Sequence, residues 1–235
     1  MSKRFFLSLA ALLTAAVAVF AQSHYEPTTS WAYLNPDFQN GSVSTYDGTI
    51  LRMADLNIYL ADGKLHFIQD GTIMEAEMGR VYIAQIGNEF FINRAGRMNR
   101  ILYQGANAVI YEQITIDYDK MNKSDIGYGI SSATASTQAT TLHQMGLDGG
   151  TFGNTLNKSL ESAVATRGEG KALELRKDMF ILINGRDIPA GKREFLAVPG
   201  LDQADAKRFL KENKIKWKDL VSLTKVAEYL AEHLK

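Results

Sequence analysis

The stretch Asn57-Ile-Tyr-Leu-Ala-Asp-Gly-Lys-Leu-His-Phe-Ile-Gln69 decides the fold class of this chain. Two runs rich in β-forming residues flank Asp62-Gly63, a pair that accepts the positive φ angles of a tight hairpin turn. Residues 80–93 repeat the arrangement, with Gly87-Asn88 between two apolar runs. Connections this short cannot hold a crossover helix, so the sequence predicts antiparallel neighbouring strands.

Residues 46–126 extend this pattern, and we expect them to form an antiparallel β domain built as a meander. Asp70-Gly71 turns the chain between two of the runs, and Gly96 precedes another. The run at residues 81–84 is apolar on both faces, which a single sheet open to water would not require. The pattern is typical of a small barrel, a sandwich-like sheet, or a sheet covered by helices.

A change of composition separates this domain from the next predicted strands. Residues 127–170 are rich in Ser, Thr and Gly, and they predict a flexible insert. Within the insert, residues 154–165 carry the spacing of one marginal helix. Residues 171–190, with an Asn184-Gly185 turn, predict strands that rejoin the β domain.

The last segment, residues 200–235, predicts a C-terminal helical hairpin, so the expected fold class is α+β. Asp202 caps the first helix, and the second begins near Asp219. Spacings of three and four join the apolar residues of the second helix, which are Leu220, Leu223, Ala227, Leu230 and Leu234. We expect this stripe to pack against the first helix or the sheet, with a coiled-coil or partner seam as the alternative.

The N-terminus carries the three parts of a secretory signal peptide over residues 1–21. Lys3 and Arg4 supply the positive end, an apolar stretch follows, and Val19-Phe20-Ala21 fits the peptidase. The apolar stretch is shorter than the roughly 20 residues of a spanning helix, so no membrane span is expected after cleavage. The chain contains no cysteine, which excludes disulfides, thiolate zinc sites and a lipid attached to cysteine.

Residues 22–45 are expected to form an extended N-terminal tail that adds at most one edge strand. Trp31 and Tyr33 in this tail are the candidate binding residues, because such rings either fasten a tail onto its own domain or contact a partner. Loss of Lys3 and Arg4 would leave 24 basic side chains against 26 acidic ones. This balance provides no basic cluster, so no nucleic-acid partner is expected.

The chemistry-bearing residues form no complete catalytic or metal motif. The four histidines, at positions 24, 66, 143 and 233, stand in separate regions, and the alternation around His66 predicts a solvated strand residue. Asp117-x-Asp119 opens like a calcium loop but lacks the glycine and the final glutamate that the loop needs. We therefore assign no catalytic residue, no metal ligand and no cofactor.

Several segments resemble small secreted proteins common in Bacteroidetes, a group with no assigned activity. They are the signal ending Phe-Ala-Gln, the segment Tyr-Leu-Asn-Pro-Asp-Phe at residues 33–38, the Gly-Tyr-Gly at 127–129, and the ending Phe-Leu-Lys-Glu-Asn-Lys-Ile-Lys-Trp at 209–217. The resemblance implies the cell envelope of a Gram-negative bacterium, in the periplasm or at the inner face of the outer membrane, with secretion as the alternative. It implies no catalytic residues.

Three functions are compatible with these observations. The first is a non-enzymatic envelope protein that binds a protein or polymer partner, in an oligomeric state that the sequence leaves open. The second is an enzyme acting on glycans or peptidoglycan through two carboxylates in a concave pocket of the β domain. The third is a carrier of an apolar ligand inside a barrel.

Overall fold

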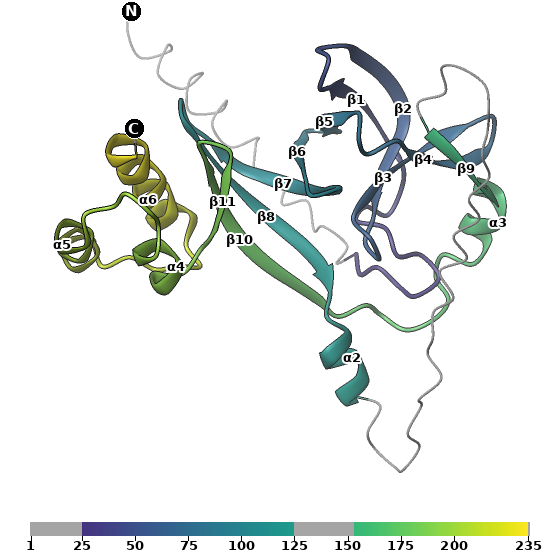
Figure 1. Ribbon diagram of the computed structural model, residues 1–235. Coiled ribbons are helices and arrows are strands. Elements are labelled where there is room, and N and C mark those ends of the chain that lie inside the picture. The colour runs from purple at the N-terminus through teal and green to yellow at the C-terminus, as the bar shows by residue number, and fades with distance from the viewer. Residues whose placement is uncertain (1–24, 125–152, 235) are drawn as a thin grey trace, which may run out of the picture.

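The structure, a computed structural model, describes residues 25–124 and 153–234. It is an α+β fold dominated by one antiparallel sheet of 11 strands (Figure 1), in the order β11-β10-β8-β7-β6-β5-β1-β2-β3-β4-β9. The strands are β1 (Gln39–Thr45), β2 (Ile50–Tyr59), β3 (Lys64–Gln69), β4 (Thr72–Ala76), β5 (Val81–Ile86), β6 (Glu89–Arg94), β7 (Arg97–Gln104), β8 (Ala108–Ile116), β9 (Gly153–Ser159), β10 (Leu175–Ile183) and β11 (Arg186–Pro189). The helices described are α2 (Tyr118–Ser124), α3 (Leu160–Ala165), α4 (Lys192–Leu196), α5 (Gln203–Asn213) and α6 (Leu220–His233). The predicted antiparallel sheet is confirmed.

Two four-stranded meanders, β1 to β4 and β5 to β8, make up most of the sheet and meet where β1 pairs with β5. The prediction for residues 22–45 is therefore wrong in part, because residues 39–45 form a central strand and not an edge. The sequence hides this position because the polar residues Asn40, Ser42 and Ser44 alternate onto a face that the core does not use. Val43 points the other way and is fully buried.

Two of the predicted turns have the positive φ angles expected for their Asp-Gly and Asn-Gly pairs. Asp70 and Gly71 both have positive φ angles, as do Asn184 and Gly185, and each pair closes a two-residue hairpin. The turn at Asp62-Gly63 differs from the prediction. There Tyr59 pairs with Lys64, so the connection holds four residues and only its glycine has a positive φ.

The sheet is strongly curved, because strands far apart in its order touch one another. The backbone N–H of Met98 in β7 donates to the carbonyl of Gly63, in the turn before β3, at 2.8 Å. Arg94 of β6 makes a two-pronged contact with Asp187 of β11, with Nη2 2.7 Å from Oδ2, although three strands separate these two in the sheet. The curvature encloses an apolar core that includes Val43, Leu56 and Phe91.

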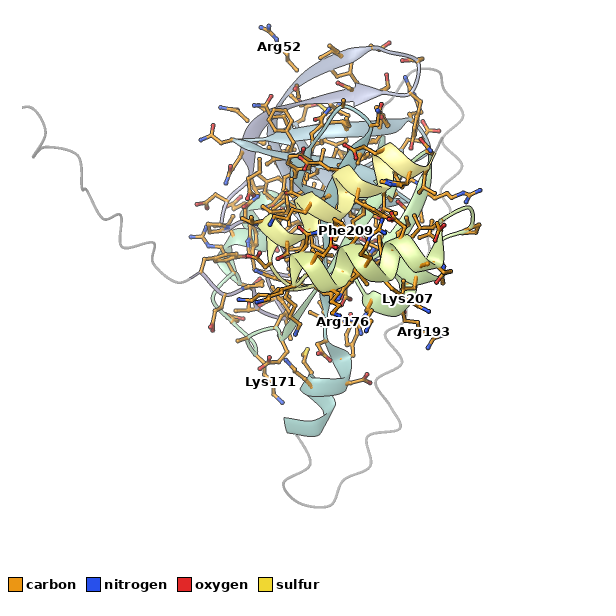
Figure 2. The ribbon with its side chains drawn as sticks, turned by 90° about the vertical axis from the view of Figure 1, so that its left-hand side faces the viewer. Arg52, Lys171, Arg176, Arg193, Lys207 and Phe209 are labelled. Atoms are coloured by element: carbon orange, nitrogen blue, oxygen red, sulfur yellow. The ribbon has the colours of Figure 1, made fainter. Side chains whose placement is uncertain are left out.

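The C-terminal helices cover the other half of the sheet and pack on β8 and β10 (Figure 1). Leu223, Ala227 and Leu230 of the predicted stripe are fully buried there. The stripe therefore packs against the protein's own core. Figure 2 shows Phe209 on α5, whose ring stacks on Tyr229 of α6 at 4.2 Å between centroids. Among the described residues, no helix is long and apolar enough to cross a membrane.

The N-terminal strap, which we define as residues 25–38, lies against the sheet as an irregular extended segment. Its backbone bonds to two places, with Leu34 N donating to Ile58 O at 2.9 Å and Leu173 N donating to Pro27 O at 2.7 Å. Trp31 and Tyr33 are 1% and 2% exposed. Both rings lie inside the fold, where they fasten the strap onto the domain.

Part of the predicted insert has regular structure. Residues 153–159 form β9, which pairs with the edge strand β4, and only residues 160–165 of the predicted helix are helical. Pairing with β4 supplies the backbone hydrogen bonds that the composition of this segment does not suggest. Asp119, from the incomplete calcium-loop pattern, lies in the first turn of α2, which begins at Tyr118. The predicted signal peptide at 1–21 and the rest of the predicted insert, residues 127–152, lie outside the described residues.

Candidate functional site

A row of polar side chains crosses three strands on the outer face of the sheet, opposite to the face toward which Val43 points. Ser42 of β1 pairs with Arg52 of β2 on one side and with Gln85 of β5 on the other. Residues directly opposite in antiparallel strands present their side chains to the same face. Arg52, Ser42 and Gln85 therefore form one continuous line of hydrogen-bonding groups.

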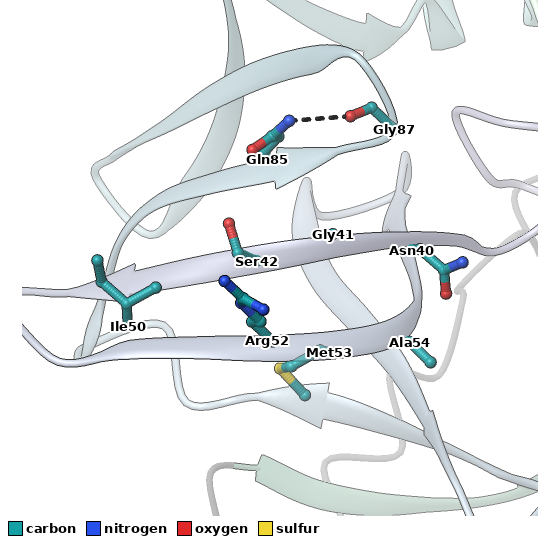
Figure 3. Close-up of a pocket in the computed structure, with 9 residues that line it drawn as sticks. All are labelled: Asn40, Gly41, Ser42, Ile50, Arg52, Met53, Ala54, Gln85 and Gly87. Carbon is teal, nitrogen blue, oxygen red and sulfur yellow. Dashed lines mark hydrogen bonds between the residues drawn. The ribbon is translucent and has the colours of Figure 1, made fainter.

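This row lies in the outer trough, a shallow open depression of about 620 Å³ (Figure 3). It is lined by Asn40, Gly41, Ser42, Ile50, Arg52, Met53, Ala54, Gln85 and Gly87. In the close-up, Arg52 and Ser42 lie beside each other across the β1–β2 pair, and Gln85 donates to the Gly87 carbonyl at 3.2 Å. Amide, hydroxyl and guanidinium groups give the trough both donors and acceptors.

Arg52 is the charged group of the outer trough. Its side chain is exposed and extends away from the body of the protein in Figure 2. Among the described residues it has no carboxylate partner within ion-pair distance. An arginine in this state keeps its five N–H donors available for a ligand.

Exposed apolar side chains border the trough. Phe90 of β6 pairs with Gln85 and is 49% exposed, and Ile50 lines the trough and is 68% exposed. Tyr46 and Tyr82 are 59% and 41% exposed, with ring centroids 5.2 Å apart. Of these four residues Ile50 lines the trough, Phe90 lies directly opposite Gln85, and Tyr46 and Tyr82 form a separate exposed pair. Large exposed apolar side chains in one place are typical of an interaction surface.

Gly41 explains why the trough forms at this point. A Cβ atom on Gly41 would lie 1.9 Å from the Gln85 carbonyl oxygen and 2.9 Å from the Leu56 side chain. Only glycine lets β1 approach β5 this closely. The register of β1 against β2 also shifts between Gln39 and Gly41, and such irregularities re-aim neighbouring side chains.

A second group of polar residues is buried under the strap. The Tyr33 hydroxyl lies 2.9 Å from His66 Nδ1, and the Tyr59 ring stacks on the imidazole at 5.1 Å. Burial raises the pKa of Tyr33. On the far side of the ring, His66 Nε2 lies 3.9 Å from Glu75 Oε2, and Lys64 contacts the same carboxylate.

The prediction of a solvated His66 is wrong, because its side chain is 3% exposed. Alternation placed His66 correctly on the face opposite Leu65 and Phe67. The strap then covers that face, and nothing within β3 itself signals the cover. This cluster holds the strap in place through the hydroxyl–imidazole contact and through the tilted and edge-on contacts of the Tyr33 ring with Tyr59 and His66. None of its residues lines the outer trough or the two other pockets described.

A cleft of about 430 Å³ between β10 and the segment before α6 contains two carboxylates, Glu112 and Asp178. Met179 is the residue opposite Glu112, so the adjacent Asp178 projects toward the other face. Asp178 is also bonded to Arg176 at 2.8 Å. The two carboxylates therefore do not converge on one point, as an acid and base pair for glycoside hydrolysis would have to.

Within the described residues, no group of three His, Asp or Glu side chains gathers at metal-binding distance. No protein-family model, curated protein or solved structure matches this chain. The candidate site therefore rests on geometry. Sequence reasoning did not single out the trough residues, because they come from three strands and meet only through strand register.

Proposed function

We propose that this chain is an exported, non-enzymatic module of a Gram-negative envelope that binds an extended glycan polymer in the outer trough. The observation that carries this proposal is the row of Arg52, Ser42 and Gln85 across three strands, in which Arg52 is exposed and Phe90 lies opposite Gln85 on the next strand. Sugar rings offer hydroxyl groups to such side chains and an apolar face to aromatic rings. An open trough admits a chain that continues past both ends.

The rest of the chain supports this role in two ways. The signal-like residues 1–21 favour export to a compartment in which glycan polymers are abundant. We further propose that the curled strands act as a small barrel that holds the trough rigid, while the C-terminal helical hairpin closes the opposite half. A rigid strand surface orients binding groups more accurately than a loop does.

Co-sedimentation with insoluble glycans tests the proposal. The mature protein is mixed with purified peptidoglycan sacculi or with chitin, and the bound fraction is measured against polymer concentration. Replacing Arg52 with Ala removes a charged donor, so binding should weaken about tenfold or more. Arg193→Ala is the matched control, because Arg193 is exposed on α4 and lies outside the trough.

Phe90→Ala should weaken binding as well, because Phe90 lies opposite Gln85 and is 49% exposed, while Tyr118→Ala should not, although Tyr118 is 55% exposed. If all four variants bound both polymers equally well, the trough would not be the binding site. Release of soluble sugar fragments during the incubation would contradict the non-enzymatic part of the proposal.

A further inference from the structure

The outer edge of β10 is open over a short stretch. β11 pairs only with Phe180–Ile183, and the last bond on this side runs from Ala190 N to Met179 O at 2.8 Å. At the other end, Leu173 N donates to Pro27 O of the strap at 2.7 Å. In Figure 1, β11 accordingly lies beside one part of β10 only.

Strand parity shows which groups face this opening. Glu174 O accepts from Asp117 N at 2.7 Å, on the side of β8, whereas Leu173 and Met179 bond on the opposite side. Alternate residues of a strand direct their N–H and C=O groups to the same side. Leu175 and Lys177 therefore direct theirs into the opening, and among the described residues no strand pairs with them there.

The opening has the length of a short peptide. Six steps separate Leu173 from Met179, and a strand rises about 3.3 Å per residue, so the gap spans about 20 Å. Unpaired strand edges of this kind bind extended peptides through main-chain hydrogen bonds. Since both ends of the gap are already occupied, the gap limits the length of the peptide.

The cleft of about 430 Å³ lies beside this edge, and its lining determines which peptide side chains the edge favours. Lys177 lines the cleft from β10 and Lys218 from the segment before α6, and both side chains are exposed. Met179, Trp217 and Ala190 add apolar surface. The lysines favour an acidic side chain in the incoming strand, and the apolar groups favour hydrophobic neighbours at alternate positions.

We propose that this edge binds an extended peptide that adds as an antiparallel strand beside Leu175 and Lys177 and places an acidic residue opposite Lys177, with an apolar residue two positions away on either side. This site is separate from the outer trough and from glycan binding, because the two share no lining residue. A bound peptide would form regularly spaced hydrogen bonds with the N–H and C=O groups of Leu175 and Lys177. A glycan has no backbone amides with that spacing.

The probe is the fluorescent peptide acetyl-Val-Thr-Glu-Thr-Val-amide, followed by fluorescence anisotropy with the mature protein. N-methylation of its glutamate removes an N–H that faces β10, so affinity should fall about tenfold or more. N-methylation of a threonine, whose N–H faces solvent, is the matched control, and its affinity should stay within about twofold. Replacing glutamate with lysine should also weaken binding about tenfold.

Lys177→Pro tests the protein side of the contact. Proline at 177 removes an N–H that serves no bond to β8, so the strand should persist while peptide binding is lost. Lys177→Ala keeps the backbone and should lose only the charge preference. If Lys177→Pro does not fold, the two N-methylated peptides still decide the outcome.

Equal loss of affinity for both N-methylated peptides, or no binding of any probe, would overturn the proposal. A dimer in sedimentation velocity that Lys177→Pro converts to a monomer would also overturn it, since a second copy would then occupy the edge. The glycan assay is independent, so either proposal can fail while the other stands.

Discussion

Acid should destabilise this fold through one identifiable carboxylate. Glu75 Oε1 lies 2.8 Å from Lys64 Nζ, and the Glu75 side chain is only 19% exposed. The His66 ring and then the Lys64 ammonium lower the pKa of Glu75 from 4.5 to about 2, although burial opposes them. A carboxyl pKa lowered by folding adds stability above its unfolded value, and this stability is lost as pH falls through the folded value.

The size of the effect follows from the contacts. The full lowering of the Glu75 pKa, from 4.5 to about 2, corresponds to about 3 kcal/mol of folding free energy at neutral pH. His66 Nε2 lies 3.9 Å from Glu75 Oε2, however, which is too long for a hydrogen bond. We therefore count mainly the Lys64 contact, and we expect Glu75 to contribute about 1–2 kcal/mol that disappears between about pH 5 and pH 2.

Urea unfolding of Glu75→Gln at several pH values measures this contribution. The variant should be less stable than the wild type by about 1–2 kcal/mol near pH 7, and the two should converge near pH 2. Glu77→Gln is the control, because Glu77 is 55% exposed and contacts Arg80 only at 3.8 Å. A stability difference for Glu75→Gln that does not change with pH would refute the reasoning.

Four further substitutions, one of them a control, test the fold. Gly41→Ala should cost at least about 3 kcal/mol or prevent folding, because its Cβ would lie 1.9 Å from the Gln85 carbonyl oxygen; a normal thermal melt would contradict the close approach of β1 and β5. Leu223→Ala should cost about 2–5 kcal/mol in urea unfolding, since Leu223 is fully buried. Val221→Ala, at a position 69% exposed, should cost less than about 0.5 kcal/mol, and equal losses would place α6 elsewhere. Asp202→Ala should cost about 1 kcal/mol through loss of the bonds to the first N–H groups of α5, and an unchanged melting temperature would argue against that cap.

Local chemistry in the sequence was enough to predict the hairpins. Asp70-Gly71 and Asn184-Gly185 accept the backbone angles of tight turns without help from distant residues. The α6 stripe and its capping Asp219 are local in the same sense. The short connections between the predicted strands required antiparallel pairing, and this pairing forms the dominant sheet.

Tertiary structure decided what covers each surface and which strands meet. His66 is buried because a strap more than 20 residues earlier in the chain folds over it, and β1 is central because β5 pairs with its free edge. The outer trough and the open edge of β10 are likewise products of register and of how far each neighbour extends. The sequence by itself determined the turns at Asp70-Gly71 and Asn184-Gly185, most of the strands between residues 46 and 190, and the helix caps, since those depend on residues close in the chain. Only the folded structure determined the order of the strands, the cover over His66 and both candidate sites, since those depend on contacts between distant segments.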